Sequence, residues 1–253
     1  MIWYNAPMLK SWLKFFRAVN LPTVPGDVWV GAVAVWFGAD IICDYGAALF
    51  NATIASVLLY MFGLADNDIV GAETDEGRPI PDGQISLRAA RIARAACVIG
   101  AIAVGLAPDP VALKPLPWMW WPAAFALLLS VVVYNRTKNW ALMGICRGLN
   151  VACGGAVAIS ASGLSGREAV SSLLWLGVCV AVWTVYIAAV TKYSEGEEMD
   201  AAKKRRVGFL IGAIVYLQIT ALLLFQSGIV VLVGVLLVMM RLMRRLLPEV
   251  SAS

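Results

Sequence analysis

The sequence predicts an all-α protein that crosses a membrane several times as a bundle of helices, and three observations support this fold class. Hydrophobic residues make up 61% of the 253 residues. Charged residues make up only 14%, whereas a soluble domain usually contains about 25%. The apolar residues also gather in long runs, and a bilayer core about 30 Å thick takes roughly 20 apolar residues of helix. We therefore expect one transmembrane domain over residues 1–253.

Eight apolar runs are candidate membrane helices, and they predict about eight, at most nine, helices around a central polar cavity. At 1.5 Å per residue, each run is long enough, or nearly so, to cross the bilayer. Only Gln226, Ser227 and Gly228 separate the last two runs, so these can form a tight hairpin. In chain order the runs are 24–43, 45–65, 88–107, 118–134, 141–161, 170–191, 207–226 and 228–246.

The positions of the basic residues predict that both termini lie in the cytoplasm. Short cytoplasmic loops keep Lys and Arg, while translocated loops lose them. With the N-terminus inside, the predicted cytoplasmic segments contain every Lys and Arg except Lys114 and Arg167. The basic N-terminal residues look like the start of a signal peptide, but the many later runs argue against a cleaved signal. We expect an integral protein of a bacterial inner membrane, with its cavity open to the cytoplasm.

The composition excludes several classes of site. The chain has no His, which removes His-based metal sites and Ser-His-Asp triads. Its five Cys show no CxxC pair, and most fall inside apolar runs, which favours packing over a disulfide or zinc framework. The net charge of +4 is small and dispersed, so a nucleic-acid partner is not expected. Any bound metal therefore needs oxygen ligands.

Two clusters of acidic residues follow apolar runs on the predicted cytoplasmic side. The first contains Asp66, Asp68, Glu73, Asp75, Glu76 and Asp82, and the second contains Glu195, Glu197, Glu198 and Asp200. Carboxylates at helical spacing supply the oxygen ligands that Mg²⁺ prefers, together with substrate phosphates. This chemistry suits a diphosphate, whose charge Arg and Lys can neutralise.

The first cluster has a second interpretation, as a solvated loop whose acids balance nearby arginines. However, Asp66, Asn67 and Asp68 directly follow an apolar run. Ionisable groups at membrane depth are costly and usually functional. This placement favours a site over a simple surface loop.

Around this cluster the sequence resembles the UbiA superfamily of membrane prenyltransferases. Asn67-Asp68 and Asp75 are similar to the NDxxDxxxD signature, with Gly71 at the position of the middle aspartate. Residues 78–86, RPIPDGQIS, resemble the RPxPSGxIS segment that follows it. The spacing from Asn67 to Arg78 is shorter than in typical members, so Asp75 can be displaced, with Glu73 as a substitute.

Two further segments carry the same resemblance. Residues 17–27 resemble the start of the family's first helix, where a basic residue and an asparagine face the cavity, although Asn20 can instead cap a helix. Residues 134–150 resemble the family's Tyr…Lys stretch and its Arg-x-x-Asn helix start. There, Arg136 and Lys138 can also be simple membrane anchors. Arg147 lies among small residues in an apolar run, so we expect a carboxylate or a phosphate beside it.

The second acidic cluster departs from the family. Members usually have a DxxxD motif after their sixth helix, and residues 191–200 contain none. Glu195 and Glu198 can donate oxygens in its place, or the segment is a surface loop balanced by residues 203–206. This departure, the segment MGICRGLN and the short chain most resemble the UbiA-like proteins of bacterial ebo-type gene clusters.

The resemblance implies an Mg²⁺-dependent prenyltransferase that moves an isoprenyl group from an isoprenyl diphosphate to an aromatic or other lipophilic acceptor among the membrane lipids. The implied catalytic and metal-binding residues are Asn67, Asp68 and Asp75, with Glu195 and Glu198 as further metal ligands. The implied diphosphate contacts are Arg78, Lys138, Arg147, Asn20, Tyr134 and Asn150. The alternatives are a catalytically degenerate UbiA-like protein that binds or transports a lipophilic metabolite, and a purely structural membrane protein.

Overall fold

The computed structural model describes residues 6–40, 46–108, 114–195, 201–225 and 230–246, and within these ranges every regular element is a helix. A short helix, α1 (Ala6–Phe15), and a 3₁₀ helix, η2 (Ala18–Thr23), come first. The long helices are α2 (Pro25–Ala39), α3 (Gly46–Val70), α4 (Leu87–Leu106), α5 (Trp120–Thr137), α6 (Trp140–Ser162), α7 (Gly166–Ser194), α8 (Ala201–Leu224) and α9 (Val230–Leu246). The predicted all-α bundle is confirmed.

Each of the eight predicted runs corresponds to one of the helices α2 to α9. Six of the described helices are long and apolar enough to cross a membrane. Of the other two, α9 has 17 described residues, and α5 ends with the polar residues Asn135, Arg136 and Thr137. The runs did not predict α1 and η2, because α1 contains two lysines and η2 is only six residues long.

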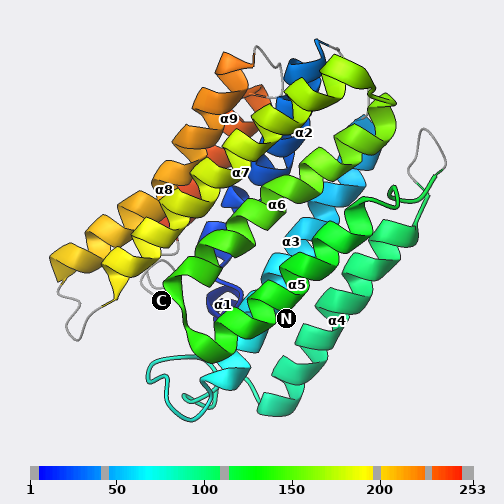
Figure 1. Ribbon diagram of the computed structural model, residues 1–253. Helices are drawn as coiled ribbons and strands as arrows, with labels where there is room; N and C mark the ends of the chain where they lie inside the picture. Colours follow the sequence, from blue (N-terminus) through cyan, green and yellow to red (C-terminus); the bar gives the residue numbers. More distant parts are fainter. Residues whose placement is uncertain (1–5, 41–45, 109–113, 196–200, 226–229, 247–253) are drawn as a thin grey trace.

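Helices α2, α6 and α7 pack against one another at the centre of the bundle. In Figure 1, α4 lies at one edge and α8 and α9 at the opposite edge, and α4 packs on α3. The core between the central helices contains Val28, Val151, Val157 and Trp183. Because α3 and α5 also contact α6, the bundle can enclose a space between these helices.

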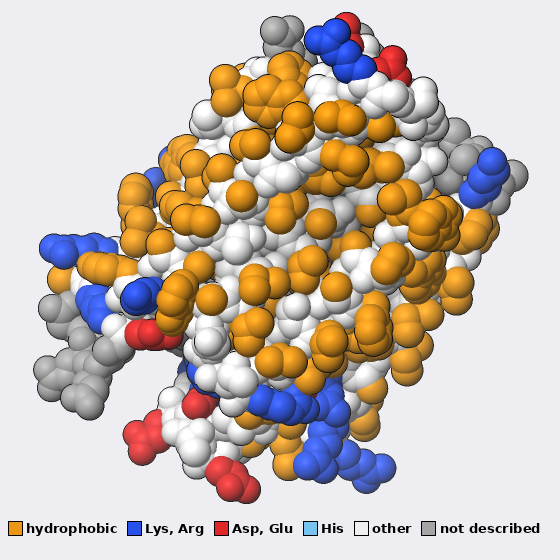
Figure 2. Space-filling view, in the orientation of Figure 1, with side chains coloured by type: hydrophobic (Ala, Val, Ile, Leu, Met, Phe, Trp, Pro, Cys, Tyr) orange, Lys and Arg blue, Asp and Glu red, His pale blue; other side chains and the backbone are white. Residues whose placement is uncertain are grey.

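The surface of the bundle is apolar over a wide band. Figure 2 shows hydrophobic side chains across the middle of one face, with the Lys, Arg, Asp and Glu side chains mostly toward its ends and edges. Large apolar side chains such as Phe125, Leu174 and Val185 are about two-thirds exposed. Apolar surface of this extent is unfavourable in water but suits lipid. The chain is therefore an integral membrane protein, as its composition predicts.

Two glycines bring α2 and α6 into very close contact. A Cβ atom added at Gly154 would lie 1.8 Å from the carbonyl oxygen of Val28, and one at Gly31 would lie 1.9 Å from that of Val151. Small residues allow membrane helices to approach each other in this way, so that van der Waals packing and short polar contacts can form. The polar network described below lies directly beside this contact.

Replacing Gly154 by Ala should separate α2 from α6 and destabilise the bundle, because overpacking a close contact costs about 1–3 kcal/mol. The matched control is Gly177→Ala in α7, where the added Cβ meets nothing within 4 Å. Thermal unfolding in detergent, followed by circular dichroism, should show a lower midpoint for Gly154→Ala only. Equal midpoints for the two variants would contradict the close packing.

Candidate functional site

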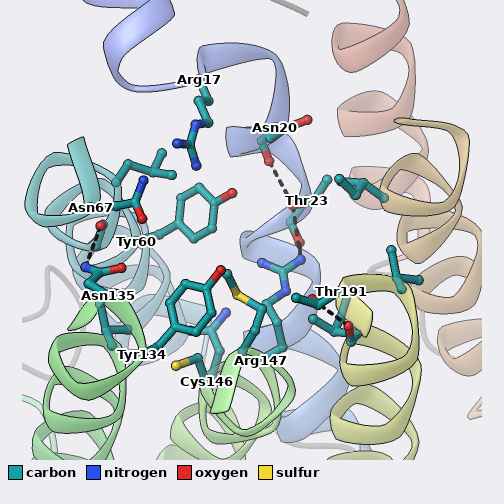
Figure 3. Close-up of a pocket in the computed structure, with 18 of the residues that line it drawn as sticks. Arg17, Asn20, Thr23, Tyr60, Asn67, Tyr134, Asn135, Cys146, Arg147 and Thr191 are labelled. Carbon is teal, nitrogen blue, oxygen red and sulfur yellow. Dashed lines mark hydrogen bonds between the residues drawn. The ribbon is translucent and has the colours of Figure 1, made fainter. Parts of the chain in front are cut away.

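A cavity of about 400 Å³ opens between η2 and the helices α3, α5, α6, α7 and α8 (Figure 3). Apolar side chains such as Leu59, Leu127, Ile187 and Ile214 form much of its wall. Its polar lining comes from segments far apart in the sequence: Arg17, Asn20, Thr23, Ser56, Tyr60, Asn67, Asp75, Arg78, Tyr134, Asn135, Lys138, Arg147, Asn150, Thr191 and Ser194. A mostly apolar cavity with a few convergent polar groups is typical of a small-molecule site.

The cavity brings together most of the residues predicted from the sequence. Those that line it are Asn20, Asn67, Asp75, Arg78, Tyr134, Lys138, Arg147 and Asn150. Asp68 is buried directly behind this lining. Glu195 is exposed after the last turn of α7 and is not among the lining residues. Glu198 lies outside the described residues.

Two of the alternatives left open by the sequence can be compared with the structure. The side chain of Asn20 lines the cavity, and the residue at the N-cap of η2 is Arg17. Arg136 is exposed, donates to the carbonyl of Val132 at 2.8 Å, and lies 3.9 Å from Asp66 Oδ2. Lys138, in contrast, lines the cavity.

The mouth of the cavity surrounds the buried carboxylate of Asp68 and consists of Arg17, Asn67, Asp75, Arg78 and Lys138. Asp68 Oδ1 accepts from Arg17 Nη2 at 3.2 Å and from Asn67 Nδ2 at 3.3 Å, and lies 3.9 Å from Arg78 Nη1. Lys138 donates to Asn67 Oδ1. Asp68 Oδ2, Arg17 Nε and Arg78 Nη1 are buried without a hydrogen-bond partner among the described residues. Because such atoms cost free energy, the mouth is suited to a polar ligand.

The loop between α3 and α4 holds Arg78 at the mouth. The carbonyl of Pro79 accepts from the N–H groups of residues 84 and 85, and Gly83 takes the positive φ of 69° that this turn needs. Ile85 is buried in a small apolar cluster with residues of α1, α3 and α4. The Ser86 hydroxyl then caps α4. The motif noted in the sequence therefore forms a closed loop that fixes its first residue, Arg78.

Gly71 lies against the carboxylate of Asp75. A Cβ at position 71 would lie 2.5 Å from Asp75 Oδ2 and 2.6 Å from Asp75 Cγ. The Asp75 N–H donates to the Gly71 carbonyl at 2.9 Å, which folds the chain back on itself. Asp75 lines the cavity, whereas Glu73 is exposed and is not among the lining residues. Asp75 therefore occupies the space beside position 71, where the family signature has an aspartate.

The mouth carries more positive than negative charge, because Arg17, Arg78 and Lys138 face only the carboxylates of Asp68 and Asp75. Burial lowers the pKa of Arg78, and the nearby Arg17 lowers it further, against the opposing effect of the two carboxylates. Partial burial also lowers the pKa of Lys138 from its ordinary value of 10.5, although Asp75 opposes this. A bound anion would relieve both effects.

The inner end of the cavity contains a second polar group of residues: Thr23, Ser56, Tyr60, Arg147 and Asn150. On α3, Ser56 is separated from Asn67 by 11 residues, or about 16 Å of helix. Arg147 Nη2 donates to the carbonyl and the hydroxyl oxygen of Thr23, both at 3.1 Å. The Ser56 hydroxyl donates to Asn150 Oδ1, which joins α3 to α6.

Asp27 neutralises Arg147 at this inner end. Arg147 Nε lies 3.1 Å from Asp27 Oδ2, and the Asp27 side chain is fully buried. The same carboxylate accepts hydrogen bonds from Asn150 at 3.1 Å, Trp183 at 2.8 Å and Gln218 at 2.7 Å. Of the carboxylate or phosphate expected beside Arg147, the structure contains a carboxylate, which comes from α2.

Several of these residues were not predicted as part of a site. Asp27 and Gln218 carried a detectable signal, because a carboxylate or an amide inside an apolar run is costly in a membrane. Ser56 and Tyr60 carried no such signal in the sequence alone. They are recognised only once the cavity shows that they share one face of α3 with Asn67, at spacings of 11 and 7 residues.

Asp66, a member of the first acidic cluster, makes contacts that join helices. Its carboxylate accepts from Arg94 Nη1 at 2.8 Å and from Asn135 Nδ2 at 3.0 Å. These bonds connect α3 to α4 and to α5. Asp66 is buried and is not among the residues that line the cavity, so its position supports the site from behind.

Lys138 should make anion binding at the mouth fall at high pH. Its amine binds an anion only when protonated, so affinity is full below the lowered pKa and is lost as the pH rises through it. The Lys138→Arg guanidinium stays charged, so this variant should keep its affinity to higher pH. Calorimetric titration with inorganic diphosphate at increasing pH tests this, and the titration of the ligand itself is common to both proteins. Identical pH profiles would contradict a role for Lys138.

Comparison with known proteins agrees with this architecture. The sequence matches the UbiA prenyltransferase family over residues 27–248. No protein of curated function matches it significantly. A solved structure described as a digeranylgeranylglyceryl phosphate synthase in membranes shares 13% sequence identity with it, at a TM-score of 0.53. The alignment covers 96% of this chain and 92% of the other, which shows a common fold. The chain belongs to the UbiA prenyltransferase family.

Proposed function

We propose that the protein is an Mg²⁺-dependent membrane prenyltransferase that transfers an isoprenyl group from an isoprenyl diphosphate to an aromatic or other lipophilic acceptor. The observation that carries this proposal is the mouth, where three cations and two carboxylates open onto an apolar cavity. A diphosphate suits the charged mouth, and a prenyl chain suits the apolar wall. Membership of the UbiA prenyltransferase family supports the same chemistry.

The residues of the mouth fit a magnesium ion that binds together with the diphosphate. Among the described residues, no three His, Cys, Asp or Glu side chains are grouped to hold a metal by themselves. Mg²⁺ usually needs only one or two carboxylates, with substrate phosphates and waters completing its ligands. Asp68 offers a buried oxygen without a partner, and Asn67 and Asp75 line the cavity beside it. When bound, the metal would neutralise charge on the leaving diphosphate.

Arg78 and Lys138 bind the diphosphate in this proposal, and Asn20 and Tyr134 add hydrogen bonds from η2 and α5. As the bond between the allylic carbon and the diphosphate oxygen breaks, the two cations stabilise the growing negative charge. The allylic carbon then bonds to the acceptor, and the proton that the acceptor releases passes to the diphosphate. The apolar walls exclude water, which would otherwise react with the allylic carbocation.

Of four other predicted residues, two receive a different role in the proposal and two keep the predicted one. Arg147 and Asn150 were predicted as diphosphate contacts, but both bind Asp27 at the inner end. We therefore assign the diphosphate to the mouth and give these two residues a role in shaping the cavity. Glu195 and Glu198 follow α7 and remain candidate metal ligands of a second acidic segment.

We further propose that the mouth faces the cytoplasm, with both termini on that side, in a bacterial inner membrane. The mouth and the neighbouring helix ends carry Arg78, Arg94, Arg136 and Lys138. Basic residues of this kind are retained on the cytoplasmic side. A soluble isoprenyl diphosphate would then reach the mouth directly.

The second candidate function is a catalytically degenerate protein that binds or transports a lipophilic metabolite. Gly71 replaces one aspartate of the family signature, and Glu195 does not line the cavity. Both observations favour a weaker metal site than that of the full signature. The carrier would use the same apolar cavity but would need no metal.

Turnover assays separate the enzyme from the carrier. Purified protein in lipid nanodiscs, given labelled prenyl diphosphates and a membrane-lipid extract, should form a labelled lipid product with Mg²⁺ and none with a chelator. Asp68→Asn should lower this activity by at least about 100-fold, whereas Glu76→Gln, at an exposed acid of the loop that follows α3, should retain it. Absence of both metal-dependent turnover and diphosphate binding would refute the enzyme. Retention of cellular function by Asp68→Asn would favour the carrier.

The contact between Gly71 and Asp75 allows a finer test of the metal site. Gly71→Ala should displace the Asp75 carboxylate and weaken Mg²⁺-dependent diphosphate binding by about 10- to 100-fold, because small misplacements at a site are costly. Thermal stability should change little, since the displaced atoms end a short, flexible side chain. Glu73→Gln is the control and should bind normally. Weak binding by Glu73→Gln, with normal binding by Gly71→Ala, would make Glu73 the ligand.

A further inference from the structure

The two polar ends of the cavity differ in net charge. At the mouth, Arg17, Arg78 and Lys138 exceed the carboxylates of Asp68 and Asp75. At the inner end, the single cation is Arg147, and the single carboxylate of Asp27 lies 3.1 Å from it. Among the described residues that line this end, no other side chain is charged. The inner end is therefore polar but neutral overall.

Other hydrogen bonds engage the remaining polar atoms of the Arg147–Asp27 ion pair. Arg147 also donates to two oxygens of Thr23, and Asp27 receives bonds from Asn150, Trp183 and Gln218. Both side chains are buried. A second anion brought beside Arg147 would also meet the field of Asp27, and burying a charge without an opposite charge is very unfavourable.

Neutral polar groups of a ligand, in contrast, can form hydrogen bonds with side chains at this end. The hydroxyl of Tyr60 has no hydrogen-bond partner among the described residues. The centre of the Tyr60 ring lies 5.9 Å from the Arg147 guanidinium. Figure 3 shows Tyr60 and Tyr134 extending from α3 and α5 toward the space in front of Arg147. The Ser56 hydroxyl donates to Asn150 and can still accept a hydrogen bond.

We propose that the inner end is the acceptor subsite and that it selects an uncharged, hydroxyl-bearing acceptor over an anionic one. This inference rests on the proposed function, which places the diphosphate at the mouth. Asp27 is then a residue that determines specificity. It cancels the charge with which Arg147 would otherwise attract a carboxylate or a phosphate on the acceptor. The Tyr60 hydroxyl binds the acceptor hydroxyl directly.

Two matched probes test the selection, para-octylphenol and para-octylbenzoate, which differ mainly in the charge of the polar group. Their binding to the full protein in neutral detergent is measured by competition, with inorganic diphosphate and Mg²⁺ present. The wild-type protein should bind the phenol at least about tenfold more tightly. Asp27→Asn should raise the affinity for the benzoate by at least about tenfold, because Arg147 is then unpaired.

Two further variants keep the inference testable if Asp27→Asn does not fold. Asp27→Asn combined with Arg147→Gln removes both charges and should retain the wild-type preference for the phenol. Tyr60→Phe should weaken binding of the phenol and leave the affinity for the benzoate unchanged. Equal binding of both probes to the wild-type protein, or a phenol affinity unaffected by Tyr60→Phe, would overturn the inference.

Diphosphate binding in the same samples distinguishes the two levels of the proposal. Asp27→Asn should still bind inorganic diphosphate, because Asp27 does not belong to the mouth. Failure of the wild-type protein to bind diphosphate would refute the proposed function itself. Normal diphosphate binding together with a preference for the benzoate would refute only the neutral acceptor.

Discussion

The ion pair between Asp27 and Arg147 connects more of the bundle than any other interaction described above. Asp27 lies in α2 and Arg147 in α6, and their hydrogen bonds extend to η2, α7 and α8. Asn150 adds α3 through Ser56. In lipid, polar groups must find their partners within the protein, and a buried ion pair is tolerated only when further hydrogen bonds complete it. The helices that surround the cavity are therefore held in one arrangement by this network.

The position of that pair also decides what the cavity can bind. Since Arg147 is already neutralised, strong attraction for an anion is confined to the mouth, where Arg17, Arg78 and Lys138 outnumber the carboxylates. The distance along α3 between Asn67 and Ser56, about 16 Å of helix, separates the two polar ends. Apolar walls lie between them. One cavity thus contains a charged region, an apolar region and a neutral polar region, an arrangement that suits the proposed transfer.

The mouth departs from the family signature at one position, Gly71, and keeps two acidic residues of that signature beside its cations. Gly71 lacks the carboxylate expected there, yet its missing side chain leaves the space into which Asp75 folds. Asp75 and Asp68 both remain beside the cations of the mouth. The second acidic segment shows no such compensation among the described residues, because Glu195 is exposed and does not line the cavity. The proposed metal chemistry therefore depends more on the first acidic segment, with Asp68 and Asp75, than on the second.

The sequence by itself determined the bundle, because lipid allows only helices with satisfied backbones, and long apolar runs reveal them directly. It also identified Asp66, Asn67 and Asp68 as polar residues at membrane depth. Only the tertiary structure decided that Asp27 pairs with Arg147, that Asp75 rather than Glu73 reaches the cavity, and that Tyr60 faces it. These facts depend on contacts between residues distant in the chain and on the direction of side chains. Sequence spacing describes one helix at a time and cannot say which faces of different helices meet.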